Sequence, residues 1–422
     1  MNKQTSKYRW VVLGTVFISY LFIVSQRTAP GLITDQLMVD FQLTAVVIGL
    51  MTSIQFFAYA GLQIPIGLLS DRYGPNVFLI IGTLLNGFGT LMYSVAGNEW
   101  LLVLARLLCG IGDATIWVNL VLILSQWFKL KEFSMLVGIA GMTGSFGFLL
   151  ATVPFSTWIA SFGWRAPFFV VGIVLVILAF LLYFVLIKQP ARIFNEEAVK
   201  EKRKLPREKT IVVLNRLIRS RQAWATFLCH FGVVGSYIGF IGSWAVPYGM
   251  DMYGLSRSDA SQLIMYGLFG AIIGAPLTSW ITGRIQSIKR PYVLVHVLVL
   301  FSWSVFLLLN GKPPYPLLVV LFFIIGYGNG ASTLTFAAVR QSFDLREVGL
   351  VSGFANTGGF LSAVLLPSIF GKILDHFNVA DSLVGYHYGF IIPVLFSLVG
   401  LFGVCLLRES PLEVKEAKEQ AV

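Results

Sequence analysis

Three charged residues of this 422-residue chain lie within long apolar stretches. Arg27 stands in FIVSQRTAPGL, and Arg106 and Asp113 stand in RLLCGIGDATIW. A charge at the centre of a membrane-spanning helix costs about 2.5–3.5 kcal/mol on insertion scales, so such residues usually face a polar interior or a water-filled cavity. Arginine stays protonated and offers a planar fork that matches a carboxylate or phosphate. Asp113 is the acid within these stretches that can gain and lose a proton.

Arg27 and Asp113 together have the chemistry to couple an anion to a proton. A carboxylate in a low-dielectric site binds a proton more readily when no arginine lies nearby. If an anion occupies Arg27, Asp113 loses its counter-ion and should take up a proton, and this coupling must be reciprocal. The alternative is a permanent structural pair. For Arg106, near the outer end of its span, a structural or gating role and a role in proton coupling both stay open.

The elements that must carry these residues are membrane-spanning helices. The chain is 56% hydrophobic and 12% charged, with a mean hydropathy of +0.79, whereas a soluble domain is about a quarter charged. Because a spanning helix needs about 20 apolar residues, we predict an all-α membrane protein with twelve spans. Pro30 predicts a kink in the first of them. The spans are 10–34, 44–69, 77–96, 101–127, 134–160, 167–187, 223–249, 260–282, 291–310, 316–338, 348–371 and 388–407.

A basic segment, 188–222, divides the spans into two groups of six. We therefore predict an N-terminal half at 1–187, a cytoplasmic linker at 188–222, a C-terminal half at 223–407 and a cytoplasmic tail at 408–422. With the N-terminus in the cytoplasm, 25 Lys and Arg residues fall on the cytoplasmic side and 4 on the other, which fixes the orientation. The linker either lies along anionic lipid headgroups or only sets topology and tethers the halves.

Two six-span halves indicate a duplicated transporter with its site near the membrane midplane. After the second span comes GLLSDRYG, and the corresponding place in the second half reads SWITGRIQ. The first segment resembles the G-x-x-x-D-R-x-G loop of the major facilitator superfamily, and the second resembles a degraded copy. The resemblance implies two pseudo-symmetric halves, alternating access and a gating loop on the cytoplasmic side. The gating-loop residues are Gly67, Asp71, Arg72, Gly74 and Arg284.

Four further segments resemble the anion:cation symporter branch of that superfamily, which includes sialin-type, hexuronate and galactonate carriers. They are SQRTAPGL, AYAGLQIPIG, GIGDA and NTGGFLSAVLLPSIFG. The resemblance places Asp113 where the branch has a protonatable glutamate. It departs at Gln26, where many members carry aspartate. Its implied substrate-binding residues are Arg27, Tyr59, Gln63 and Asn356.

The seventh span adds His230, Tyr237, Trp244 and Tyr248 at spacings of seven, seven and four residues. Such a stripe indicates either packing or the lining of a cavity. Tyr237 is a further candidate for substrate binding, because a tyrosine presents a donor and an apolar face together. For His230, a proton relay and a satisfied histidine both stay open.

The remaining composition narrows the function. We find no metal-ligand spacing, no phosphate-binding G-x-x-x-x-G-K-[ST] and no catalytic constellation, so we expect neither an enzyme nor a cofactor, and no nucleic acid partner. We predict a proton-coupled importer of a small organic anion. The alternatives are an exporter or antiporter of lipophilic or cationic compounds, and a non-transporting receptor or membrane enzyme. We expect a functional monomer, in contact with membrane lipids, that crosses a bacterial plasma (inner) membrane many times with both termini cytoplasmic.

Overall fold

The structure is a computed structural model that describes residues 3–43, 45–193, 208–377 and 382–409. Within these ranges the chain is almost entirely helical and contains no strand. It divides into two compact units, which are described separately. Unit 1 comprises Met1–Lys129, Thr143–Leu214 and Asp344–Gly353, and unit 2 comprises Leu130–Met142, Asn215–Phe343 and Phe354–Val422.

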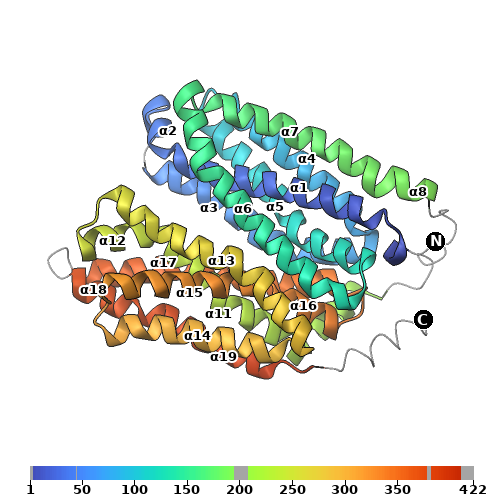
Figure 1. Cartoon of the computed structure of the whole chain (residues 1–422). Coiled ribbons are helices and arrows are strands. Elements are labelled where there is room, and N and C mark those ends of the chain that lie inside the picture. Colours follow the sequence, from blue (N-terminus) through green and yellow to red (C-terminus); the bar gives the residue numbers. More distant parts are fainter. Residues whose placement is uncertain (1–2, 44, 194–207, 378–381, 410–422) are drawn as a thin grey trace. The chain divides into compact units, whose positions relative to one another are not determined.

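Unit 1 is a bundle of long helices (Figure 1). Its α4 packs against α5 and α7, while α3 packs against α5. One side-chain cap and one proline mark two helix beginnings in unit 1: Asn98 accepts from the Leu101 N–H at the start of α5, and Pro75 opens α4. The helices are α1 (Arg9–Thr28), η2 (Ala29–Leu32), α2 (Thr34–Asp40), α3 (Ala45–Tyr73), α4 (Pro75–Ser94), α5 (Glu99–Trp127), the later part of α6 (Leu130–Phe162), α7 (Arg165–Tyr183), η3 (Phe184–Lys188), α8 (Gln189–Ile193) and α10 (Thr210–Arg219, shared with unit 2).

Unit 2 is a second helical bundle, in which α13 packs along α15 and α11 along α19. Glycines let α13 and α15 approach, because a Cβ at Gly326 would overlap the Gly267 carbonyl. The helices are α11 (Arg221–Ser243), α12 (Ala245–Tyr253), α13 (Arg257–Ile285), α14 (Lys289–Leu308), α15 (Tyr315–Ala331), α16 (Leu334–Ser342), α17 (Val348–His376, whose first turns belong to unit 1), α18 (Ser382–Gly389) and α19 (Ile391–Leu406).

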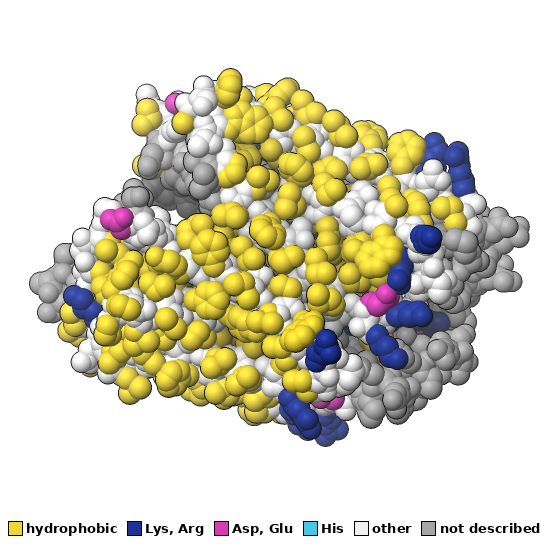
Figure 2. Space-filling view, viewed as in Figure 1, with side chains coloured by type: hydrophobic (Ala, Val, Ile, Leu, Met, Phe, Trp, Pro, Cys, Tyr) yellow, Lys and Arg dark blue, Asp and Glu magenta, His cyan; other side chains and the backbone are white. Residues whose placement is uncertain are grey.

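The predicted spans are confirmed as helices. Eleven helical segments of the described chain are long and apolar enough to cross a membrane. In addition, α3 covers the predicted span 44–69, of which residue 44 is not described. Hydrophobic side chains cover the visible flanks of the helices in each unit, and Lys and Arg gather towards helix ends (Figure 2). Such a surface suits a lipid environment at the flanks and water at the ends.

Three spans are interrupted well inside their predicted limits, and the twelfth also breaks near its start, at Phe390 between α18 and α19. The expected effect of Pro30 is confirmed, since α1 gives way to the 3-10 turn Ala29–Leu32. Two other interruptions were not predicted: α11 ends at Ser243 before α12, and α15 ends at Ala331 before α16. The second one extends the tenth span, so Arg340 is a helical residue that is only 1% exposed and not the loop residue that its place in the sequence predicted.

Parts of two predicted segments lie outside the described residues, namely 194–207 of the linker and 410–422 of the tail. The compact units also assign 130–142 to unit 2 and 344–353 to unit 1. The division into halves at 1–187 and 223–407 remains a prediction from the sequence.

Candidate functional site

The buried charges of unit 1 form an ion pair. Arg27, in the last turn of α1, donates from Nε to Oδ2 of Asp113 in α5 over 2.9 Å. The side chain of Asp113 is 1% exposed and that of Arg27 is 17% exposed. Breaking a buried pair by removing one partner typically costs about 3–5 kcal/mol, because an uncompensated charge is left behind. The pairing predicted from the sequence is therefore present in the structure.

Arg27 uses only part of its guanidinium in this pair. Its Nη1 and Nη2 groups have no hydrogen-bond partner among the described residues. The guanidinium carbon lies 5.1 Å from the ring centroid of Tyr59, which stabilises a cation by about 0.5–2 kcal/mol. Two parallel N–H donors, held over an aromatic ring, remain available for an anion.

Arg106 is tied to the same place through the backbone. Its Nη2 donates to the carbonyl oxygen of Arg27 over 3.4 Å, and its guanidinium carbon lies 5.6 Å from the Tyr93 ring centroid. It makes no ion pair with Asp113 in the described structure. Arg106 therefore holds the end of α1, where the helix changes to a 3-10 turn.

Gln55 is a site residue that sequence reasoning missed. Its Nε2 donates to Oδ2 of Asp113 over 2.9 Å, from a position that is 1% exposed. The other carboxylate oxygen, Oδ1, is buried and has no partner among the described residues. A signal was available, because Gln55, Tyr59 and Gln63 recur every four residues and so share one face of α3.

Gln26, which stands where many members of the symporter branch carry aspartate, belongs to a buried polar network. Gln26 Nε2 donates to Asn86 Oδ1 over 2.6 Å, and the Thr90 hydroxyl donates to Gln26 Oε1 over 3.3 Å. All three side chains are at most 1% exposed. An amide satisfies these partners without a charge, so this position holds no second acid beside Arg27.

Gln63 lies on α3 but faces backbone groups. Its Nε2 donates to the carbonyl oxygens of Tyr59 and Ala114 at 3.3 and 3.4 Å, and its side chain is fully buried. Its predicted contact with substrate remains a prediction.

Asn356 and Tyr237 belong to unit 2, where Asn356 is 3% exposed and hydrogen-bonds with His230, while Tyr237 is 9% exposed.

The gating loop has two distinct glycines. Gly74 has φ +92°, which strongly favours glycine, and it precedes the first residue of α4. Gly67 lies against the start of α17, where a Cβ would overlap the Gly349 carbonyl. Both are constrained by the backbone and not by a side-chain contact.

Asp71 caps the N-terminus of α17 within unit 1. Its Oδ1 accepts from the Gly349 N–H over 2.8 Å and its Oδ2 from the Leu350 N–H over 2.7 Å. Asp71 lies just beyond the end of the predicted span 44–69, and so outside the membrane-spanning segment. Burial raises the pKa of its carboxyl well above the ordinary value, although the two backbone N–H groups lower it in part.

The two arginines of the repeated loop differ in their contacts. Arg72 Nη2 donates to the Thr210 hydroxyl over 2.7 Å and to the Glu208 carbonyl, at the start of α10. Arg284, in the second copy, has its guanidinium carbon 5.4 Å from the Trp280 ring centroid on its own helix. Arg72 in the first copy of the loop thus connects α3 to the start of α10, whereas the contact of Arg284 in the second copy stays within its own helix.

The aromatic stripe on the seventh span divides into two parts. Tyr248 donates to the Gly311 carbonyl over 2.6 Å and the Trp244 indole to the Pro367 carbonyl over 3.2 Å, so these two residues pack. Tyr237 is instead placed against Gly267, where a Cβ would lie 3.1 Å from its ring. No hydrogen bond of its hydroxyl to a described residue is found.

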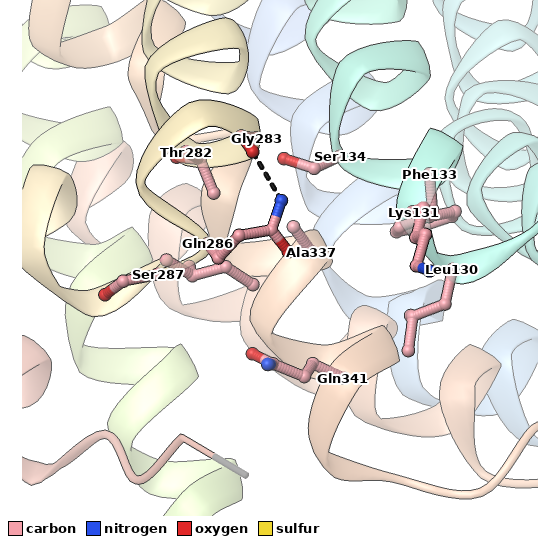
Figure 3. Close-up of a pocket in the computed structure, with 11 residues that line it drawn as sticks. Leu130, Lys131, Phe133, Ser134, Thr282, Gly283, Gln286, Ser287, Ala337 and Gln341 are labelled. Atoms are coloured by element: carbon pink, nitrogen blue, oxygen red, sulfur yellow. Dashed lines mark hydrogen bonds between the residues drawn. The ribbon is translucent and has the colours of Figure 1, made fainter. Parts of the chain in front are cut away.

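A small pocket at one end of unit 2 is separate from these residues. Figure 3 shows the Gln286 side chain folded back onto the Gly283 carbonyl, with Ser134 approaching from α6. None of the predicted substrate or proton residues lines it. The described residues also contain no group of three or more His, Cys, Asp or Glu side chains that could hold a metal ion.

Comparison with known proteins shows which family and which transporters the chain resembles in sequence. The sequence profile of the Major Facilitator Superfamily matches residues 16–367 and 305–422. A probable sulfoacetate transporter from Cupriavidus necator is 25% identical over 402 residues, which is 90% of each protein. A probable galactarate/D-glucarate transporter from Bacillus subtilis is 23% identical and covers 91% of this chain and 90% of its own.

Two further similarities agree with these. A gentisate transporter from Corynebacterium glutamicum is 25% identical and covers 86% of this chain and 81% of its own. Among solved structures, the fucose:proton symporter of E. coli superposes with a TM-score of 0.71 at 14% identity, over 96% of this chain and all of that one. At that identity the structural likeness concerns the fold alone.

Proposed function

The chain belongs to the Major Facilitator Superfamily, and we propose that it imports a small organic anion together with a proton. It is a multi-pass membrane transporter and not an enzyme. Its relatives are named as transporters of organic acids, which supports the anionic class of substrate. The proposed proton coupling rests on Arg27 and Asp113 of unit 1. Import follows from this coupling when the proton gradient is directed inward, because the anion then moves with the proton.

The observation that carries the proposal is the partial pairing of Arg27 with Asp113. Arg27 spends one nitrogen on Asp113 and keeps Nη1 and Nη2 open. A carboxylate, phosphate or sulfonate fits that fork with two parallel hydrogen bonds. Tyr59, beneath the guanidinium, adds an apolar face for the organic part of the substrate.

Coupling follows from competition between two acids for one cation. At an effective dielectric constant of about 20, a pair of unit charges 4 Å apart attracts by about 4 kcal/mol. When the substrate anion takes over the guanidinium, Asp113 loses much of that attraction. A proton then neutralises Asp113, and its unpartnered Oδ1 offers the place to receive it.

The same argument gives the return step. A proton on Asp113 weakens its hold on Arg27, which favours anion binding, and release of the proton restores the pair and favours anion release. Because one acid replaces another on Arg27, neither step leaves a bare cation in the protein interior. Alternating access would expose the site first to the outside and then to the cytoplasm.

The proposal is tested by uptake and binding with the purified protein. In proteoliposomes, an inward proton gradient should drive uptake of at least one of sulfoacetate, D-glucarate, L-galactonate or gentisate. The same anions should raise the melting temperature of the protein by mass action, and more so at the lower of two pH values. Proton-driven efflux of cationic or lipophilic compounds, without anion uptake, would instead support an exporter.

A further inference from the structure

A groove in unit 2 runs between α13 and α14, with α15 as its floor. Both helices pack against α15 more than against each other, which leaves the space between them open. The groove has a volume of about 320 Å³, near the lower end of the range of about 300–1,000 Å³ that ligand sites occupy. None of the predicted substrate or proton residues lines it.

The charge of this groove is confined to one end. Arg290, in the first turn of α14, lines the groove and is exposed, and its guanidinium has no partner among the described residues. Two other polar side chains belong to the lining, and they satisfy each other: the Thr278 hydroxyl donates to the Tyr327 hydroxyl over 2.7 Å. The other lining residues are apolar. A single open cation therefore stands at one end of an apolar channel.

The apolar wall faces out of the unit. Ile285 on α13 is 47% exposed, and Leu294 and Leu298 on α14 are 59% and 36% exposed. Both helices are long and apolar enough to cross a membrane. Exposed apolar side chains on such helices meet the acyl chains of lipids, so the groove opens towards lipid.

The sizes of the lining residues favour a lipid over another helix. Helices that pack against each other in a membrane have small residues at their interface, which let the backbones approach. None of the described residues that line the groove is glycine or alanine. The apolar wall does not choose among lipids, because their tails are equally apolar, so any preference must come from Arg290.

Arg290 is the basic residue of its turn that stays available. The guanidinium carbon of Arg284 lies 5.4 Å from the ring centroid of Trp280. The Nζ of Lys289 donates to two backbone carbonyls at the C-terminal end of α19 over 2.7 and 2.9 Å. The sequence predicts that this turn is cytoplasmic, and Trp280 is of the type that gathers at membrane–water interfaces. A guanidinium at that level matches a lipid phosphate with two parallel hydrogen bonds.

We propose that the groove binds one anionic phospholipid of the leaflet that the sequence predicts to be cytoplasmic. Its phosphate lies on the Arg290 guanidinium, and one acyl chain lies along the groove between α13 and α14. The net negative charge of the headgroup gives the preference for this class of lipid. The inference concerns unit 2 alone and does not depend on the transported substrate.

The test titrates the purified protein in detergent micelles with two lipids that have the same acyl chains. Phosphatidylglycerol is anionic, whereas phosphatidylcholine has a phosphate but no net charge. A bound lipid raises the melting temperature by mass action. We expect phosphatidylglycerol to do so at an about fivefold lower concentration than phosphatidylcholine, as one basic residue near a membrane surface allows. Inorganic phosphate should leave the melting temperature unchanged over the same range.

Three variants separate the headgroup contact from the chain contact. Arg290→Gln should raise the required concentration of phosphatidylglycerol about fivefold, to that of phosphatidylcholine. Arg192→Gln is the charge-matched control, because Arg192 is an exposed arginine of α8 in unit 1, and it should leave the preference unchanged. Leu298→Trp places bulk in the groove without a change of charge, so it should weaken the binding of both lipids.

Four results would overturn the proposal. Equal concentrations of the two lipids for the wild-type protein would remove the anionic preference, and equal losses in Arg290→Gln and Arg192→Gln would show diffuse attraction without a site. An equal response to inorganic phosphate would indicate a site for a free anion. A dimer of the purified protein that Leu298→Trp separates would show that a second copy covers the groove.

Discussion

Single atoms of Arg27 and Asp113 decide what the site can do. Each residue has one atom engaged in the pair, Nε and Oδ2, and each has further polar atoms without a described partner. A structural pair would be expected to satisfy both groups fully, because half-satisfied buried networks are costly. The open atoms are thus better explained by an anion and a proton that come and go.

Gln55 should set the pH at which the pair responds. Its amide donates to Asp113 Oδ2 and so favours the charged form of that acid. Gln55→Leu should move the midpoint of pH-dependent uptake upward by about one to two pH units, since a hydrogen bond to a charged group contributes about 1.5–3 kcal/mol. Uptake measured across a pH series tests this.

The control for that experiment is Thr83→Val. Thr83 is equally buried in unit 1, but its hydroxyl donates to the Leu79 carbonyl of its own helix. Its midpoint should match that of the wild-type protein. A midpoint that moves downward in Gln55→Leu, or moves equally in both variants, would contradict the role given to Gln55.

The sequence predicted the charged part of this site and missed the neutral part. Asp113 is the one acid in the middle of a predicted span, and Arg27 is the cation within the first predicted span. An unpaired charge inside a span is costly, and this cost predicted that the two residues pair. Gln55 carries no charge, and a glutamine in a span has no comparable cost. Its role depends on the approach of α3 to α5, which a single sequence does not fix.

At the scale of elements, the start of α17 is held by α3 through two hydrogen bonds and a close backbone contact. The carboxyl oxygens of Asp71 accept from two N–H groups at the N-terminus of α17. Gly67, one turn earlier on α3, lets the backbones approach. The family resemblance predicted a gating loop here, and the contacts supply a physical means for it.

Gly67→Ala should weaken this contact strongly. The added methyl overlaps the Gly349 carbonyl, and overpacking of this kind typically costs about 1–3 kcal/mol. Gly61→Ala is the matched control, because Gly61 lies on the same helix with no atom within 4 Å of the added methyl. Thermal unfolding should show a lower melting temperature for the first variant and an equal or higher one for the second. Equal losses in both would refute the close-contact explanation.

The Asp71 contact should also depend on pH. Burial raises the pKa of Asp71 in the folded protein above the ordinary value of 3.8, so the folded contact binds a proton more tightly than the unfolded chain does. Its contribution to stability is therefore full below about pH 4 and is lost as pH rises through the raised pKa. The melting temperature of the wild-type protein, relative to Asp71→Asn, should fall as pH rises over that window. A difference that stays constant or grows with pH would contradict this.

Prolines mark two of the three interruptions well inside the predicted spans. The kink expected at Pro30 is present, since α1 ends at Thr28 and a 3-10 turn follows. The end of α11 at Ser243 lies four residues before Pro247, which cannot donate to the Ser243 carbonyl and whose ring clashes with it, so this signal was available in the sequence and was missed. The interruption after Ala331 has no proline beside it, so the apolar run around Thr333 was predicted as one continuous span.

For the whole molecule, the distribution of basic residues predicts the orientation in the membrane. The count of 25 Lys and Arg on one side to 4 on the other predicts that both termini lie in the cytoplasm. The finding that Arg340 is buried in α16 removes one residue from the larger group and leaves the bias intact.

Labelling of single cysteines tests this orientation. In a variant lacking Cys109, Cys229 and Cys405, an impermeant maleimide applied to intact cells should label Lys312→Cys, which lies between α14 and α15. It should leave Lys129→Cys, between α5 and α6, unlabelled until the cells are opened. The reverse pattern would invert the topology.

The central claim is that Asp113 carries the proton that accompanies the anion on Arg27. It is tested most directly by comparing net uptake with exchange in Asp113→Asn proteoliposomes, using whichever anion the wild-type protein accumulates. Asparagine imitates the protonated acid, so the variant should exchange internal for external anion at a rate close to wild type and should lose accumulation driven by a proton gradient. Accumulation that persists in Asp113→Asn at the wild-type level would contradict the claim.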